Sequence, residues 1–106
     1  MSRDHRPNVL PLEGEIDLHI SPEVAERLRG MVAEKPQVLV VDLDKVTYLD
    51  SSGLAALIEG MQGVQEYGGK FTLANVQESV RHIFEIARLD QVFEIAPDVE
   101  SALEAK

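Results

Sequence analysis

Two adjacent serines, Ser51 and Ser52, are the residues of this chain best placed to do chemistry. They lie in the segment Asp50-Ser51-Ser52-Gly53, where a strongly apolar stretch gives way to an amphipathic one. We expect a helix to begin there, and the first N–H groups of a helix lack partners within it and lie at the positive end of its dipole. A side-chain cap or a phosphate can satisfy such an end. The residues alone leave open whether a serine here is a switch or only a cap.

Three aspartates near this segment raise the alternative of a magnesium site. Asp42, Asp44 and Asp50 follow apolar stretches, and carboxylates bind Mg²⁺ in phosphoryl-transfer sites. Strand ends and turns also favour Asp, because its side chain hydrogen-bonds nearby backbone N–H groups. No lysine or threonine pattern completes a phosphoacceptor site around them, and His5 and His19 have no metal-ligand spacing. We therefore expect no metal and no cofactor.

A hydrolase is the second enzymatic alternative. It would use Ser51 or Ser52 as the nucleophile, His82 as the base and Asp90 to orient that base. The chain has no Gly-x-Ser-x-Gly elbow, no Walker sequence and no kinase signature. Any phosphate on Ser51 must therefore come from another protein, and we expect no catalytic residue in this chain.

Length and charge narrow the class of protein further. The chain has 106 residues, enough for one domain with its own core, and no cysteine for a disulfide or a thiolate site. Its net charge of −9 opposes binding to nucleic acid and anionic lipid, and it suits either a basic partner or simple solubility. The first residues lack the apolar core of a signal peptide and no window is apolar enough to cross a bilayer. We expect a cytoplasmic protein with a flexible N-terminus over residues 1–7.

Hydrophobic periodicity predicts alternating strands and helices. The strand from Val9 to Ile16 is broken by Pro11 and Gly14, which predicts an edge or interrupted strand. The remaining elements are expected as a helix over 21–34, a strand over 38–41, a turn at 42–45, a short strand over 46–49, a helix from Asp50 to about Gly68, a strand over 70–74, a helix opened by Asn75-Val76-Gln77-Glu78, a strand over 92–95 and a helix over 98–105.

Local chemistry supports several of these boundaries. Ser21 before Pro22 predicts a helix cap, and Asn75 followed three residues later by Glu78 predicts a capping box. Gly60 and Gly63 inside an amphipathic helix each cost about 1 kcal/mol relative to alanine. Their presence indicates that another backbone, a partner or a packed neighbouring element comes close.

The alternation favours a single α/β sheet with parallel pairs. Loops that follow parallel strands meet at one edge, and ligands of such sheets bind beyond the carboxyl ends of the strands. We expect that edge to hold Asp17, Asp44, Asp50 and Ser51.

Several segments resemble the STAS domain of bacterial anti-sigma factor antagonists. The similarity covers nearly the whole chain from about Val9, and its most specific part is the segment from Asp50 to Gly53. The matching segments are Leu12-Glu13-Gly14-Glu15-Ile16-Asp17, Val40-Val41-Asp42-Leu43, Val46-Thr47-Tyr48-Leu49-Asp50-Ser51-Ser52-Gly53-Leu54, Tyr67-Gly68-Gly69-Lys70 and Phe84-Glu85-Ile86-Ala87-Arg88-Leu89.

The resemblance implies a fold. It implies a single STAS-like domain over residues 8–106, with a mixed sheet of four to five strands and about four helices. The family usually has a longer strand pair before the Gly-Glu-Ile-Asp segment, whereas here only Val9 to Leu12 precede it. The first strand is therefore expected to be short or atypical, which affects the sheet edge and any homodimer that uses it.

The resemblance also implies a function. Such a domain is a binding module and not an enzyme: unphosphorylated, it binds an anti-sigma factor that is also a serine kinase, and phosphorylation ends the complex until a serine phosphatase resets it. The phosphoacceptor is the first serine of the motif, which is Ser51 here. The partner-contacting surface would include Asp17, Asp50, Ser51, Ser52 and Gly53, with no direct contact to nucleic acid and no membrane insertion.

The same fold leaves two alternatives open. The chain could be a cytoplasmic STAS subunit of a lipid-type ABC transport system, or a scaffold subunit of a sensory complex. For an anti-sigma factor antagonist, a phosphate on Ser51 would add about −1.5 to −2 charges beside Asp50. An interface that accepts a neutral hydroxyl would then have to desolvate a dianion.

Overall fold

The computed structural model describes residues 6–104. In chain order its elements are β1 (Val9–Ile16), α1 (Ser21–Ala33), β2 (Val38–Leu49), α2 (Ser51–Glu66), β3 (Lys70–Ala74), α3 (Glu78–Ile86), β4 (Glu94–Ala96) and α4 (Val99–Glu104). Strands and helices alternate without exception over this range. The predicted α/β class is therefore confirmed.

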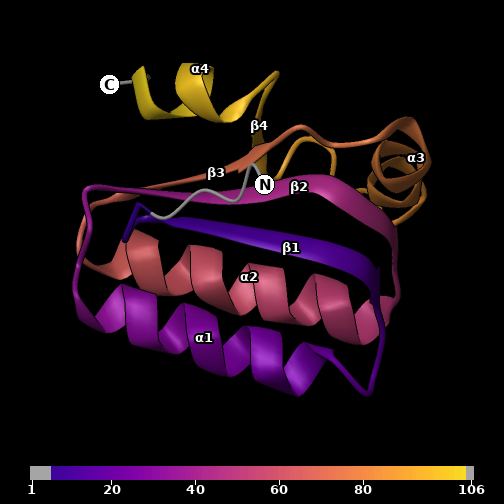
Figure 1. The fold of residues 1–106 in the computed structure, drawn as a ribbon, viewed down its shortest axis with the longest axis horizontal. Helices are drawn as coiled ribbons and strands as arrows, with labels where there is room; N and C mark the ends of the chain where they lie inside the picture. Colours follow the sequence, from indigo (N-terminus) through magenta and orange to yellow (C-terminus); the bar gives the residue numbers. More distant parts are fainter. Residues whose placement is uncertain (1–5, 105–106) are drawn as a thin grey trace.

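The four strands form one sheet in the order β1-β2-β3-β4. All three neighbouring pairs are parallel, which corrects the expectation of a mixed sheet for the part of the chain that the structure describes. The reason is the connections: each strand is followed by a helix that returns the chain to the same end of the sheet. Helices α1 and α2 lie along one face, α4 lies over the other face, and α3 lies towards one end of the sheet (Figure 1).

Strand β1 is the interrupted edge strand that the sequence predicts. Its pairing with β2 shifts register between Pro11 and Glu13 and again between Gly14 and Glu15. Gly14 has a φ of 81°, a conformation that favours glycine. The strand spans eight residues, so it is atypical in its pairing and not in its length.

Strand β2 corrects a second expectation. It runs without interruption for 12 residues, so the turn predicted at residues 42–45 does not exist. The polar residues there have a different cause: β3 pairs with β2 only as far as Asp42, while β1 continues beside β2 to Leu49. Beyond Asp42 one side of the strand loses its neighbour, and Asp44 and Lys45 are exposed there.

Two predicted helix caps are also wrong. Ser21 is already helical, its side chain does not cap α1, and the residue before the helix is Ile20. Asn75 has a φ of 58° and its side-chain amide donates to Asp42 Oδ1 at 3.0 Å, while Gln77 precedes α3 without a side-chain cap. In both cases the polar side chain is used for a contact between elements that are distant in the sequence.

The core lies mainly between the sheet and helices α1 and α2. The largest fully buried side chains of this cluster, which Phe84 of α3 joins, are Phe84, Ile16, Leu28, Leu39, Leu43, Leu49, Leu57 and Leu73. A smaller cluster on the opposite face joins Val9, Val40 and Ala74 to Val99 and Ala102 of α4.

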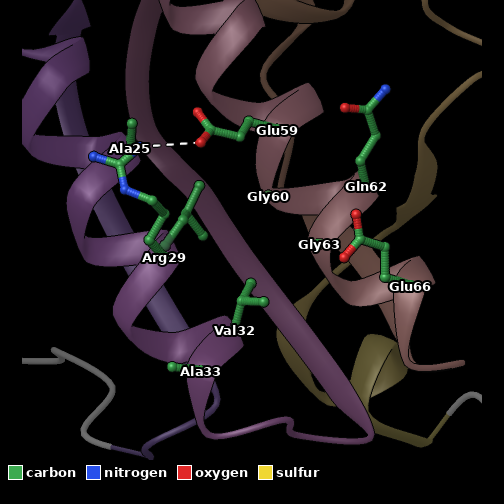
Figure 2. A pocket seen from close by; sticks show the side chains of 10 residues that line it. Ala25, Arg29, Val32, Ala33, Glu59, Gly60, Gln62, Gly63 and Glu66 are labelled. Carbon is green, nitrogen blue, oxygen red and sulfur yellow. Dashed lines mark hydrogen bonds and ion pairs between the residues drawn. The ribbon is translucent and has the colours of Figure 1, made fainter.

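The two glycines inside α2 let α1 approach closely. A β-carbon at Gly60 would lie 3.0 Å from Leu28 Cδ1, and one at Gly63 would lie 3.0 Å from Val32 Cγ1. The close neighbour that the sequence indicates is therefore the adjacent helix. Figure 2 shows the pocket that remains between the two helices, across which Arg29 and Glu59 form an ion pair of 3.0 Å.

The last strand is shorter than predicted, and the terminal helix begins one residue later than predicted. Strand β4 has three residues, Glu94–Ala96, and α4 begins at Val99. Phe93, expected in the strand, is instead buried against Phe84 and Phe71 with ring centroids 5.5 and 6.2 Å away. Ala105, where the terminal helix was expected to end, lies outside the described residues, as do five of the seven residues expected to form a flexible N-terminus.

Candidate functional site

The candidate site lies where β1 and β2 end side by side. Ile16 pairs with Leu49, and the backbone N–H of Asp50 donates to the carbonyl of Ile16 at 3.2 Å. Asp17 and Asp50 therefore follow neighbouring strands at one edge of the sheet. Asp44, which was expected at the same edge, lies inside β2 instead.

Asp50 is the cap of α2. Its Oδ1 accepts hydrogen bonds from the backbone N–H groups of Ser52 at 2.9 Å and Gly53 at 3.0 Å, and from the Ser52 hydroxyl at 2.6 Å. The Ser52 hydroxyl, followed by the Gly53 N–H, lowers the pKa of Asp50 below its ordinary value, and the backbone of Leu18 adds a smaller effect in the same direction. The carboxylate is thus held ionised at the helix start, where the helix dipole also favours negative charge.

Gly53 brings the start of α2 against both strands. It is buried, and a β-carbon there would lie 2.8 Å from the carbonyl oxygen of Ile16 and 2.9 Å from Leu49 Cδ2. No other residue fits without a shift of the backbone. Gly53 therefore positions the two serines, and its predicted contact with a partner stays a prediction.

The two serines differ sharply in their surroundings. Ser51 is the first residue of α2, it is exposed, and within residues 6–104 its hydroxyl has no hydrogen-bond partner. Ser52 is half-buried; its hydroxyl donates to Asp50 and accepts from the Ser21 hydroxyl at 2.9 Å. Only Ser51 offers a free hydroxyl to a reagent from solution.

Asp17 shapes the loop between β1 and α1. Its carbonyl accepts from the backbone N–H groups of Ile20 at 3.0 Å and Ser21 at 2.7 Å, and its Oδ1 accepts from the backbone N–H of His19 at 3.0 Å. The structure therefore brings Asp17, Asp50 and Ser51 to one edge of the sheet, as the sequence predicts for these three residues, and Ser52 and Gly53 follow them in α2.

Four residues of this edge were missed by reasoning from the sequence. Leu18, Ile20 and Tyr48 have 70%, 40% and 45% of their surface exposed, although all three are large apolar residues. Leu18 and Ile20 are apolar residues in a polar loop, a pattern that could have identified them. Ser21 was predicted to cap a helix. Its hydrogen bond to Ser52 could not be predicted from the spacing of residues in the sequence.

The two enzymatic alternatives gain no support from the geometry. In the part of the chain that the structure describes, no group of three or more His, Asp or Glu side chains is arranged to hold a metal ion. Asp42 Oδ1 instead accepts from the backbone N–H of Asp44 at 3.1 Å and from Asn75. His82 is exposed, and its Nδ1 lies 3.6 Å from Glu85 Oε1 on α3.

The lengths and composition of the helices bear on whether one of them could cross a membrane. Across residues 6–104, no helix combines the length and the apolar character required to span a bilayer.

Together these features define a class of protein: a small α/β domain that presents an exposed serine at a helix start beside an aspartate cap. The chain belongs to the STAS domain family, whose sequence model matches residues 1–102.

Several of the proteins that this chain resembles are described as anti-sigma factor antagonists. The anti-sigma-B factor antagonist of Bacillus subtilis is 30% identical over 93 residues, which cover 88% of this chain and 84% of that protein. The crystal structure of an anti-sigma factor antagonist from Mycobacterium paratuberculosis superposes with a TM-score of 0.81 at 29% identity, covering 95% of this chain and 86% of the other. The phosphorylated form of the Bacillus cell fate determinant SpoIIAA shares the fold, with a TM-score of 0.66 at 20% identity over 87% of this chain and 84% of that one.

Proposed function

We propose that this protein is an anti-sigma factor antagonist whose switch is Ser51. Unphosphorylated, it binds an anti-sigma factor that is also a serine kinase and thereby frees a sigma factor. Phosphorylation of Ser51 by that kinase ends the complex, and a serine phosphatase restores it. The protein has no catalytic role of its own, and it acts in the cytoplasm.

The observation that carries the proposal is the contrast between the two serines. Ser51 is exposed and its hydroxyl has no partner among residues 6–104, whereas the Ser52 hydroxyl is already bonded on both sides. A kinase needs a hydroxyl that can enter its active site without breaking the fold. Ser51 meets this requirement.

The switch is supported by local electrostatics. Asp50 already uses the N–H groups of Ser52 and Gly53, so a phosphate on Ser51 gains little from these donors and remains at the surface. It would add about −1.5 to −2 charges beside an ionised carboxylate, on a chain of net charge −9. A partner surface fitted to a neutral hydroxyl would have to desolvate this charge, which costs more than the contact gains.

The recognition surface is proposed to join polar and apolar residues of the same edge. Asp17, Asp50, Ser51 and Ser52 supply its polar part, and Gly53 holds α2 against the strands so that the serines are presented. Leu18 and Ile20, on the loop next to Asp17, are exposed and offer apolar area that a protein partner can bury.

The experiment is incubation of the protein with its cognate anti-sigma kinase and ATP, followed by mass spectrometry and a binding assay. Wild type is expected to gain one phosphate on Ser51 and to lose affinity, Ser51→Asp to bind weakly from the start, and Ser51→Ala to bind without being modified. Ser79→Ala, which removes an exposed serine on α3, is the matched control and should behave as wild type.

Three results would contradict the proposal. One is the absence of phosphate on Ser51 of wild type, and the second is equal binding by wild type and Ser51→Asp. The third is co-purification with a permease and its ATPase, or with a large sensory assembly, in place of a kinase; this outcome would support the transport or scaffold alternative.

A further inference from the structure

The hydroxyl of Ser52 is held from two sides by side chains of different elements. It donates its proton to Asp50 Oδ1 at 2.6 Å and accepts the proton of Ser21 Oγ at 2.9 Å. A serine hydroxyl has one proton to donate and two lone pairs to accept with. The proton and one of the two lone pairs of Ser52 are therefore in use.

Ser21 is fixed in the position from which it donates. It is the first residue of α1, only 5% of its surface is exposed, and its backbone N–H donates to the carbonyl of Asp17 at 2.7 Å. Helix α1 is in turn packed on α2 through Leu28 and Val32 against the two glycines. The backbone of Ser21 is therefore held beside Ser52, and the Ser21 hydroxyl is buried there.

Phosphoryl transfer requires an acceptor hydroxyl that is free to react, and the hydrogen bonds of Ser52 oppose this reaction. The serine oxygen uses a lone pair to form a bond to the γ-phosphorus of ATP. The bond from that phosphorus to the bridging oxygen breaks, ADP leaves with its electron pair, and the hydroxyl proton passes to a base of the kinase. For Ser52, the proton would first have to leave Asp50 Oδ1, and the hydrogen bond from Ser21 occupies one of the two lone pairs that could form the new bond.

Asp50 does not replace the kinase base in this step. The pKa of its carboxyl lies below the ordinary value, chiefly because the Ser52 hydroxyl and the Gly53 N–H bond to the ionised form. Such a carboxylate is a weak base. The short bond from Ser52 therefore restrains this hydroxyl and does not activate it.

We propose that Ser21 is a positioning residue that restricts phosphorylation to Ser51, because its hydrogen bond holds the hydroxyl of Ser52 out of reach of the kinase. This rests on the proposed function, since it presumes a kinase that acts on this helix start. The proposal means that a residue of α1, distant in sequence from the Asp50–Gly53 motif, helps to decide which of the two serines is modified.

The test compares variants in which Ser52 is the only hydroxyl of the motif. Ser51→Ala, Ser51→Ala with Ser21→Ala, and Ser51→Ala with Ser21→Thr are incubated with the anti-sigma kinase and ATP, and phosphate on Ser52 is quantified by tandem mass spectrometry. Glu23→Ala in the Ser51→Ala background is the control for a change in the first turn of α1. Circular dichroism checks each fold; if Ser21→Ala does not fold, Ser21→Cys, a weak donor, takes its place.

Ser51→Ala is expected to remain almost unmodified, and loss of the Ser21 hydroxyl is expected to raise the rate of Ser52 phosphorylation at least about fivefold, the size of one net hydrogen bond. Ser21→Thr keeps the hydroxyl and should match Ser51→Ala, as should Glu23→Ala. No increase with Ser21→Ala, or an equal increase with Glu23→Ala, overturns the inference.

The outcome for wild type separates the two proposals. Phosphate on Ser51 of wild type without an effect of Ser21→Ala removes only the role of Ser21. No phosphate on wild type contradicts the proposed function and the role of Ser21 together.

Discussion

At the start of α2, Asp50 fills the capping role that the sequence left undecided between Asp50 and Ser51. It is the cap, and it bonds two backbone N–H groups and the Ser52 hydroxyl through a single oxygen. Because the cap is a residue other than Ser51, that serine can be modified without removing a bond that holds the helix start.

The lowered pKa of Asp50 has a consequence for stability against pH. The ionised form is favoured in the folded state, so its contribution is complete above the unfolded-state pKa, near the ordinary value of 3.8, and is lost as the pH falls through the lower folded-state pKa. We expect the difference in unfolding free energy between wild type and Asp50→Ala to be constant near neutral pH and to shrink below about pH 4. Urea unfolding at a series of pH values measures it.

Asp44→Ala is the control, because this exposed residue lies in the middle of β2 and caps no helix. A difference between wild type and Asp50→Ala that grows on acidification would contradict the role given to the carboxylate.

At the scale of elements, the close contact of α2 with the ends of β1 and β2 depends on one missing side chain. A methyl group at Gly53 would lie 2.8 Å from a carbonyl oxygen that cannot move alone. We expect Gly53→Ala to lower the free energy of unfolding by about 1–3 kcal/mol, the usual cost of overpacking. Chemical denaturation checks it.

Gly30→Ala provides a matched comparison. Gly30 lies inside α1 and a β-carbon there would have no neighbour within 4 Å. Alanine is favoured over glycine in a helix by about 1 kcal/mol, so the same substitution should stabilise the protein at this position. A similar loss of stability in both variants would mean that the contact at Gly53 does not matter.

Much of the order of strands and helices could be predicted from the sequence, because hydrophobic periodicity indicates helices and strands and a glycine pair indicates where a helix ends. The start of α2 was found from Asp50 to Gly53 alone, since capping is decided within a few residues. The prediction of a turn at residues 42–45 was wrong. Asp44 and Lys45 are polar because β3 stops pairing with β2 before them, and the end of that pairing depends on another strand. Ser21 and Asn75 were misread for the same reason: each has a partner 31 or 33 residues away.

At the scale of the whole molecule, the switch is expected to change recognition and leave folding alone. Ser51 is exposed and its hydroxyl bonds nothing in residues 6–104, so its phosphorylation removes no contact of the folded state. The free energy of unfolding should change by less than about 0.5 kcal/mol, as for most surface changes. Thermal unfolding of the purified phosphorylated and unphosphorylated forms measures this, and a loss above about 2 kcal/mol would mean that the complex ends by unfolding.

The irregular pairing of β1 has a consequence for how this domain can meet other proteins. An exposed strand edge is a template for adding a further strand, and proteins protect such edges with bulges, prolines or very short strands. Here one outer strand carries Pro11 and two register shifts, and the other has only three residues. Neither outer strand is a good template for a strand from another chain, which favours binding of partners at the loops at the strand ends, where the Ser51 hydroxyl lies.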